Sequence, residues 1–227
     1  MTTRATTVAT KNSASTSGKG RVPRAGRPSS PLITREAAAA AALRLIDDKG
    51  LDALSLQAVA KELGVSAPSL YHHFRDKEEL LAEVARSLLA EVGQEQEQWS
   101  ADWEGRMVEL SCATRRVALR HPNAAPLSLR FFPRRLMLPA YEAGLRDCPY
   151  PLETHMIVHE VVEKFTYGSS LFAAAAETHH IPAMPEVDAA HFPRLAEALE
   201  VAPSDEEIFK EGLQVLLAGL RARYGKQ

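Results

Sequence analysis

Apolar side chains recur at intervals of three and four residues through most of the chain, and this spacing restricts the fold more than any other feature of the sequence. Residues with this spacing lie on one face of an α-helix, whereas a half-buried strand needs strict alternation. No run of alternating residues suggests a strand, so the predicted fold class is all-α. The clearest stripe consists of Trp103, Met107, Leu110, Thr114 and Val117.

Helix-capping residues divide this pattern into separate helices. Ser, Thr and Asp accept hydrogen bonds from the free N–H groups of a first helical turn, while Gly and Pro mark helix ends. Candidate caps precede four apolar stripes, at Thr34, Ser55, Ser66 and Asp76. The expected helices cover residues 37–46, 55–63, 66–74, 77–91, 103–120, 136–145, 153–176 and 205–224, with at most a short helix at 192–199 in a proline-rich loop over 178–204.

Residues 1–31 differ in composition from the rest of the chain. They contain six basic residues, no acidic residue and eleven Ser or Thr, with few sizeable aliphatic side chains. Such a segment cannot bury enough apolar surface to offset the entropy lost on ordering, so we expect a disordered basic arm. It lacks the apolar core of a secretory signal, and its prolines and glycines argue against the amphipathic helix of an organellar transit peptide.

The composition of the whole chain excludes several classes of protein. No apolar run approaches the roughly 20 residues that span a bilayer, so no membrane association is predicted. Two cysteines, Cys112 and Cys148, cannot form a disulfide framework, which fits a reducing cytosol. The net charge is −2, and because the arm contributes +6, the remaining residues carry −8. This polarised charge distribution is compatible with a protein that binds nucleic acid at one end.

Residues 55–74 have the layout of a helix-turn-helix motif. Two short helical segments, 55–63 and 66–74, flank a turn in which Gly64 permits a tight change of direction. Such motifs present their second helix to the major groove of DNA. Many small helical bundles contain similar turns, so this spacing is weak evidence without the identity of the residues.

The order of residues in this motif resembles the signature of the TetR family of bacterial repressors. The segment Ser55–Phe74 and its continuation Asp76–Leu81 carry the resemblance, which extends over 34–90. It implies an N-terminal three-helix helix-turn-helix DNA-binding domain over 32–80. It also implies a larger helical domain over 81–227 that binds an effector and dimerises.

Side chains left exposed on the third helix are candidates for contact with DNA. The resemblance implies that Pro68 and Ser69 face base edges and that Tyr71 and Lys77 contact phosphates. Gln57 could bond to adenine. Either His72 or His73 could instead pack against the first helix. The predicted DNA-binding residues are Gln57, Ser66, Ala67, Pro68, Ser69, Tyr71, His72 and Lys77.

The basic arm precedes this motif, and two roles remain open for it. Its arginines could enter an A·T-rich minor groove, or the arm could be a tail that releases counterions from any DNA sequence.

Beyond residue 90 the resemblance narrows to the tetracycline-repressor branch of the family. It is carried by 119–129 with Pro133, by 165–168 and by 209–220. In that repressor a loop histidine ligates the magnesium of the drug complex, whereas Ser128 occupies the matching position here, so we do not expect tetracycline to bind. Neighbouring Phe131 and Phe132 favour an apolar or aromatic effector.

The effector pocket is expected between helix 103–120, loop 128–133 and helix 153–176. Its predicted residues are Met107, Leu110, Ser128, Phe131, Phe132, His159 and Phe165.

Two further patterns concern dimerisation and metal binding. Apolar stripes on helices 153–176 and 205–224, with Gly212 and Gly219 seven residues apart, predict a homodimer through a four-helix bundle. The alternative is that these stripes fill an intramolecular core.

His155 and His159 have the spacing of metal ligands, but no third ligand is evident, so no metal or other cofactor is predicted. Cys112 and Cys148 could be redox sensors, but Cys112 is expected to be a packed thiol on the interior side of its helix.

We find no glycine-rich phosphate loop, nucleophile elbow or carboxylate pair on a rigid frame, so we expect no enzymatic activity. The predicted function is that of a DNA-binding transcriptional regulator in the bacterial cytoplasm, associated with the nucleoid. It would be a repressor that binds a palindromic double-stranded operator as a homodimer and that a small-molecule effector releases. Helix 77–91 would be the lever between the domains. The alternatives are an activator, or a small-molecule-binding helical protein without DNA binding.

Overall fold

The computed structural model describes residues 33–95, 98–132, 134–180 and 184–225, and the predicted basic arm lies outside this range. The described residues form helices and no strand, which confirms the all-α prediction. The longer helices are α1 (Arg35–Lys49), α4 (Lys77–Gln94), α5 (Trp103–Arg120), α7 (Arg134–Arg146), α8 (His155–His179) and α10 (Asp205–Tyr224). The shorter helices are η1 (Leu51–Ala53), α2 (Leu56–Glu62), α3 (Ala67–Tyr71), α6 (Leu127–Arg130), η2 (Leu152–Thr154) and α9 (Pro193–Glu200).

The first four α-helices begin at the caps that the sequence predicts. The Thr34 side chain accepts a hydrogen bond from the Ala37 N–H, and Ser55 accepts one from Ala58. Asp76 accepts one from the Glu79 N–H at 2.8 Å. Helix α1 ends at Gly50, whose φ of 77° is readily adopted by glycine alone among the common residues.

The predicted end of the third helix is wrong, because α3 stops at Tyr71 and not at Phe74. The three residues after Tyr71 turn back toward α1, where Arg35 donates a hydrogen bond to the His73 carbonyl oxygen. The guanidinium of Arg35 also lies 4.3 Å from the ring centroid of fully buried Phe74. A contact with a residue distant in sequence therefore holds the segment that follows the helix, and local propensity does not reveal it.

Helices α1 to α4 share a core, which Leu70 and Phe74 close from the side of α3. Helix α4 contributes Leu80, Leu81 and Val84 to this core, and its later residues Leu88 and Val92 belong to the same core as Ala113 and Val117 of α5. The predicted domain boundary between residues 80 and 81 thus falls inside a continuous helix.

Arg35 also joins α1 to α4 through two carboxylates. It donates to Glu79 at 2.9 Å and to largely buried Glu83 at 3.2 Å. Glu79 accepts a further bond from the Arg75 backbone N–H at 2.9 Å. This backbone bond, reinforced by both arginines, lowers the pKa of Glu79 to about 2. Its ionised form is therefore favoured in the folded state.

Because its folded pKa is depressed, Glu79 contributes stability that is present above pH 4.5 and lost as pH falls toward 2. We expect the free energy of unfolding of Glu79→Gln to fall less between pH 6 and pH 2 than that of the unsubstituted protein. Urea titrations at both pH values measure the difference, with Glu78→Gln as the control for a more exposed carboxylate of the same turn. Equal acid sensitivity of the unsubstituted protein and Glu79→Gln would contradict this assignment.

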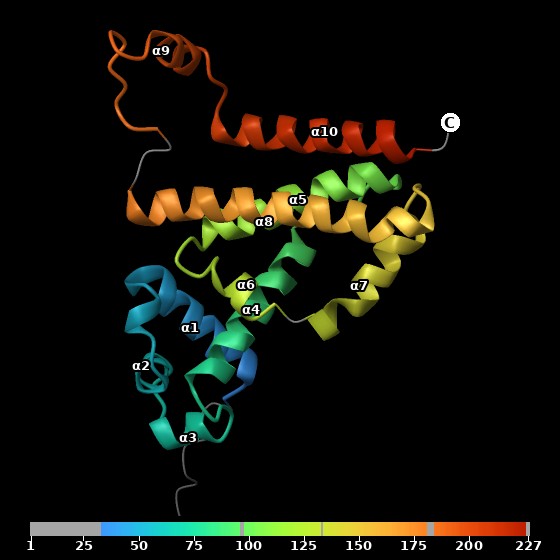
Figure 1. Cartoon of the computed structure of the whole chain (residues 1–227). Helices are drawn as coiled ribbons and strands as arrows, with labels where there is room; N and C mark the ends of the chain where they lie inside the picture. Colours follow the sequence, from blue (N-terminus) through green and yellow to red (C-terminus); the bar gives the residue numbers. More distant parts are fainter. Residues whose placement is uncertain (1–32, 96–97, 133, 181–183, 226–227) are drawn as a thin grey trace, which may run out of the picture. The chain divides into compact units, whose positions relative to one another are not determined.

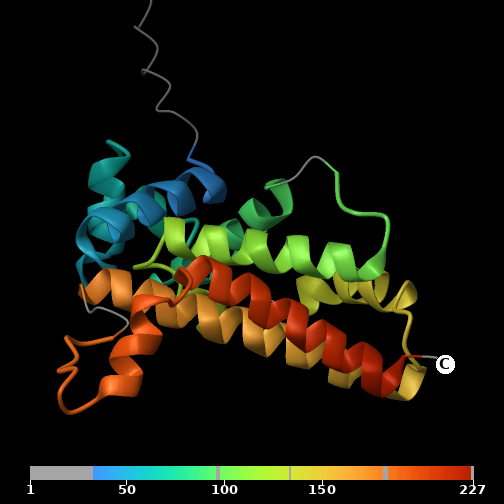
Figure 2. The ribbon, with the colours of Figure 1, turned by 90° about the horizontal axis from the view of Figure 1, so that it is seen from above.

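The C-terminal half is built around α5, α8 and α10, which run side by side (Figures 1 and 2). Their shared core contains Trp103, Val158, Val162, Leu213 and Leu217. Helix α7 crosses near the start of α5, where the Trp103 indole N–H donates to the Gly144 carbonyl at 2.8 Å. Helix α9 buries none of its residues. The bounds predicted for α10 agree with the structure, because Ser204 and Glu207 form a reciprocal capping box.

Candidate DNA interface and ligand cavity

Helices α2 and α3 are joined by the turn that the sequence predicts. Gly64 has a φ of 66°, and the Val65 N–H bonds to the Ala60 carbonyl at 2.9 Å. Ala60 is 2% exposed, as close contact between the two helices requires. This geometry leaves one side of α3 facing outward.

Most predicted DNA-binding side chains are exposed, in or beside α2 and α3. Gln57, Ser66, Pro68 and His72 are exposed, and Tyr71 is 46% exposed despite its size. The Gln57 side-chain amide donates to the Tyr71 hydroxyl at 3.4 Å, so the start of α2 and the end of α3 present adjacent polar groups. The hydroxyl oxygens of Ser66 and Ser69 lie 2.7 Å apart.

Three other residues of this region are less exposed. Ala67 packs partly against the N-terminal core. Lys77 donates from Nζ to the Leu51 carbonyl at 3.2 Å, so its ammonium group must leave this partner to reach a phosphate. Of the two histidines, His73 is half-buried beside α1 and His72 is on the surface.

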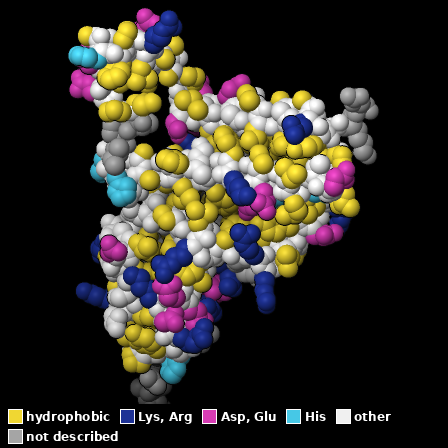
Figure 3. Space-filling model, viewed as in Figure 1, with side chains coloured by type: hydrophobic (Ala, Val, Ile, Leu, Met, Phe, Trp, Pro, Cys, Tyr) yellow, Lys and Arg dark blue, Asp and Glu magenta, His cyan; other side chains and the backbone are white. Residues whose placement is uncertain are grey.

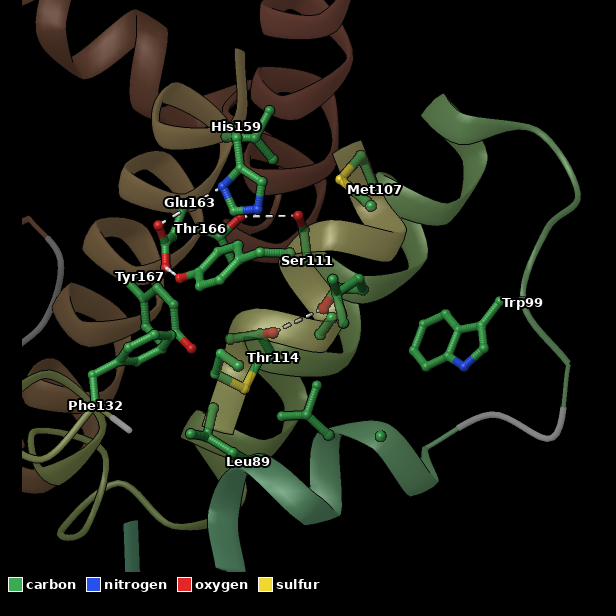
Figure 4. A pocket seen from close by; sticks show the side chains of 18 residues that line it. Leu89, Trp99, Met107, Ser111, Thr114, Phe132, His159, Glu163, Thr166 and Tyr167 are labelled. Carbon is green, nitrogen blue, oxygen red and sulfur yellow. Dashed lines mark hydrogen bonds and ion pairs between the residues drawn. The ribbon is translucent and has the colours of Figure 1, made fainter. Parts of the chain in front are cut away.

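A cavity of about 320 Å³ lies in the C-terminal half, between α5, α8, α7 and the last turns of α4. Its wall is mostly apolar and aromatic, with a polar cluster contributed by α8 (Figure 4). The lining residues include Leu89, Val92, Trp99, Met107, Leu110, Ser111, Thr114, Phe132, Met137, Tyr141, His159, Glu163, Thr166 and Tyr167. A cavity of this size and character suits a small organic molecule.

Four of the seven predicted effector residues line this cavity, namely Met107, Leu110, Phe132 and His159. Phe132 contacts Tyr167 edge to face, with ring centroids 5.9 Å apart.

Ser128, Phe131 and Phe165 do not line the cavity. The segment expected to be a loop at 128–133 begins as helix α6, in which the Ser128 hydroxyl donates to the Ala125 carbonyl at 2.6 Å. Ser128 borders a much smaller hollow beside the cavity. Phe131 packs against the core that α1 to α4 share with α5 and α6. Phe165 stacks on Phe209 at 5.5 Å, between α8 and α10.

Two of the helices that form the cavity wall are not predicted from the sequence to line it. Helix α4 contributes Leu89 and Val92, and α7 contributes Met137 and Tyr141. The spacing of four between Met137 and Tyr141 marks an apolar face on α7, which is a usable signal. Nothing in the sequence shows that this face turns toward α5 and α8.

The polar cluster centres on Glu163. Its carboxylate accepts a hydrogen bond from the Tyr141 hydroxyl at 3.0 Å, and Nδ1 of His159 lies 3.9 Å away. Burial lowers the pKa of His159 and outweighs the opposing effect of Glu163. Burial raises the pKa of Tyr141 to about 12, and raises that of Tyr167 as well. Near neutral pH, the imidazole and both phenols are therefore uncharged.

The His155 and His159 pair does not converge on one point. The Nε2 atom of His155 lies 2.8 Å from the Tyr150 carbonyl oxygen, away from the cavity. The described residues contain no group of three side chains that could hold a metal ion. Cys112 is half-buried, and burial raises the pKa of its thiol.

A chain of polar contacts connects the two halves near the cavity. Nδ1 of His121, after the end of α5, lies 2.7 Å from an Asp47 oxygen in α1. Its Nε2 lies 3.2 Å from Glu91 in α4. The Asn123 side chain donates to the Asp47 carbonyl at 3.2 Å. His121 therefore contacts both α1 of the DNA-binding half and α4, the helix that extends from that half to the cavity.

Across the described residues, no helix combines the length and the apolar character needed to cross a membrane.

Comparison with known proteins agrees with both halves of this architecture. The tetracycline repressor protein class D of Escherichia coli is 29% identical over 200 residues, which cover 84% of this chain and 90% of that protein. Among solved structures, a Streptomyces coelicolor A3(2) protein described as a possible TetR family transcriptional regulator has a TM-score of 0.67 and 27% identity. That match covers 83% of this chain and 99% of the other.

The structure of ActR from Streptomyces coelicolor in complex with (S)-DNPA is also similar, with a TM-score of 0.64 and 25% identity over 84% of this chain and 98% of that one. The family model for bacterial regulatory proteins of the tetR family matches residues 39–84, around the helix-turn-helix motif. The model for the tetracyclin repressor-like C-terminal domain matches residues 96–224, which contain most of the cavity wall. The chain therefore belongs to the tetR family of bacterial regulatory proteins, with a C-terminal domain of the tetracyclin repressor type.

Proposed function

We propose that the protein is a homodimeric repressor that binds a palindromic operator and that a small organic effector releases from DNA. The observation that carries the proposal is the double role of α4. Its first turns pack under α3 and beside α1, and its last turns line the cavity through Leu89 and Val92. A ligand that changes the position of one end of this helix must also affect the other, which couples the two sites.

The His121 contacts support the same coupling. They place a side chain from the end of α5, a cavity-lining helix, against both α1 and α4. Effector binding would favour a dimer geometry in which the two copies of α3 no longer match successive major grooves. The site of action would be the nucleoid in the bacterial cytoplasm.

The apolar face of α8 and α10 supports the proposed dimer. Figure 3 shows hydrophobic side chains gathered over these two helices. Ile157 and Phe172 on α8 are 47% and 83% exposed, and Ile208 and Val215 on α10 are 52% and 62% exposed. A second copy of the same face would cover these side chains in a four-helix bundle. Leu216 and Leu220, which the sequence places in the same stripe, instead pack within the chain.

The walls of the cavity support an apolar or aromatic effector. ActR, a similar protein, is solved with the small molecule (S)-DNPA. Tetracycline is not the proposed effector here, because the serine at the position of the repressor's metal-binding histidine lies outside the cavity and its hydroxyl is already engaged.

A mobility-shift assay with the DNA upstream of the protein's own gene tests DNA binding. The full-length protein is expected to shift this DNA at low salt, and the shift is expected to weaken as salt increases. Absence of a shift at low salt would exclude the repressor function.

Two substitutions on α3 should separate phosphate contact from base recognition. Tyr71→Ala removes an exposed hydroxyl assigned to phosphate, so all operator variants should lose a similar factor, about five- to tenfold. Ser69→Ala should alter preference at one base step by about 1–3 kcal/mol. Binding to an operator library measures both profiles. Identical losses for the two variants across the library would contradict these roles.

A further inference from the structure

The lining of the cavity contains one carboxylate that forms no ion pair with a Lys or Arg of the described residues. Among the described residues that line it, Glu163 is the one acidic side chain, and neither Lys nor Arg is present. In the described chain, His159 is the one group within ion-pair distance of the Glu163 carboxylate, at 3.9 Å. By contrast, Glu160 on the same helix is paired with Lys164 at 2.5 Å.

The neighbours of Glu163 do not neutralise it. Burial keeps His159 uncharged by lowering its pKa, so the imidazole supplies no positive charge near neutral pH. Its Nδ1 atom is buried and has no hydrogen-bond partner among the described residues. Tyr141 donates one hydrogen bond to the carboxylate, which can accept about four in total. The Glu163 carboxylate thus lacks a cationic partner among the described residues and retains accepting capacity at the cavity.

Aromatic rings surround the same space. The ring centroids of Tyr141 and His159 lie 4.7 Å apart. Phe132 packs edge to face on Tyr167 (Figure 4). Trp99 lines the opposite side of the cavity. Aromatic faces attract cations through their quadrupoles, most strongly where water is excluded. The Arg134 guanidinium lies 5.8 Å from the Phe132 ring centroid, outside the cavity lining, and it forms no ion pair with Glu163. A carboxylate without a Lys or Arg partner among aromatic rings is complementary to a cation with an apolar body, and it repels an anion.

We propose that the cavity binds an organic cation, a protonated amine carried on an apolar or aromatic body, and that Glu163 is its counter-ion. The ammonium group would donate to the Glu163 carboxylate, and the body would pack against Phe132, Tyr167 and Trp99. This inference rests on the proposed function, in which the cavity is the effector site, and it adds the charge of the effector.

Three naphthalene derivatives of nearly equal size test the charge preference by calorimetric titration of the full-length protein without DNA. These are 1-naphthylmethylamine, 1-naphthalenemethanol and 1-naphthoate. We expect the amine to bind about tenfold or more tightly than the alcohol, and the carboxylate to bind more weakly than both. Equal binding of amine and alcohol, or no binding of the amine, would overturn the proposal.

Two matched variants assign the preference to one carboxylate. Glu163→Gln should lower the affinity for the amine by about tenfold or more and change that for the alcohol by less than about threefold. Glu160→Gln, on the same helix but outside the cavity, should leave both affinities within about twofold. A Glu163→Gln protein that retains the affinity for the amine would overturn the assignment.

Failure of this inference can be distinguished from failure of the proposed function. If the amine binds with the expected selectivity but never releases the operator, the charge assignment stands and effector control through this cavity fails. If the protein shifts the operator as expected but the amine does not bind, the proposed DNA-binding function is retained and the proposed cation site is rejected.

Discussion

Val215→Asp is expected to convert the proposed dimer into monomers and to lower operator affinity by about 100-fold or more. Val215 is 62% exposed in the single chain and lies on the apolar face of α8 and α10. In a two-fold symmetric interface each substitution occurs twice, so two carboxylates would be buried against apolar side chains without partners. A monomer would engage one half-site and lose the avidity of the pair.

Light scattering after size exclusion measures the oligomeric state, and titration of an operator measures the affinity. Val201→Asp is the matched control, because Val201 is 81% exposed after α9 and lies outside the α8 and α10 face. The control is expected to remain dimeric. A Val215→Asp protein that stays dimeric at the same concentration would place the interface elsewhere.

Phe74→Ala is expected to destabilise the DNA-binding half by about 3–5 kcal/mol, a large part of the stability of a typical domain. Phe74 is 0% exposed and closes the core between α1, α3 and α4. Its loss leaves a cavity and removes the ring beneath the Arg35 guanidinium. Arg35 would then hold Glu83 and the His73 carbonyl less firmly, so the end of α3 would also loosen.

Urea unfolding followed by circular dichroism measures this loss. Phe192→Ala provides a Phe-to-Ala control at a site that is 58% exposed, where a change within about 0.5 kcal/mol is expected. A loss below about 1 kcal/mol for Phe74→Ala would show that Phe74 is not the support of this core.

The elements that agree with sequence prediction are those that nearby residues determine. Helix α10 begins where Ser204 and Glu207 cap each other, three residues apart, and its predicted bounds match the structure. The turn at Gly64 and the caps at Ser55 and Ser66 follow the same rule. The interactions that set these helix ends and turns join residues only a few positions apart, so they can be predicted from the sequence.

Prediction and structure disagree at positions whose contacts involve residues distant in the sequence. Arg35, 38 residues away, bonds to the His73 carbonyl just after the end of α3. Phe165 is among the residues predicted for the cavity, yet it stacks on Phe209 because α10 lies beside that face of α8. Tyr141 was not expected at the cavity, but it bonds to Glu163 across 22 positions of sequence.

By itself, the sequence determined that this protein is helical and that it carries a helix-turn-helix head with an outward-facing α3. Helical periodicity, caps and a glycine turn are local properties, and they operate within one or two turns of chain. Tertiary structure alone decided which side chains enclose the cavity, that α4 joins both halves, and that Glu163 faces aromatic rings without a counter-ion. These features depend on which helices pack together, and many of the contacts join residues far apart in the chain.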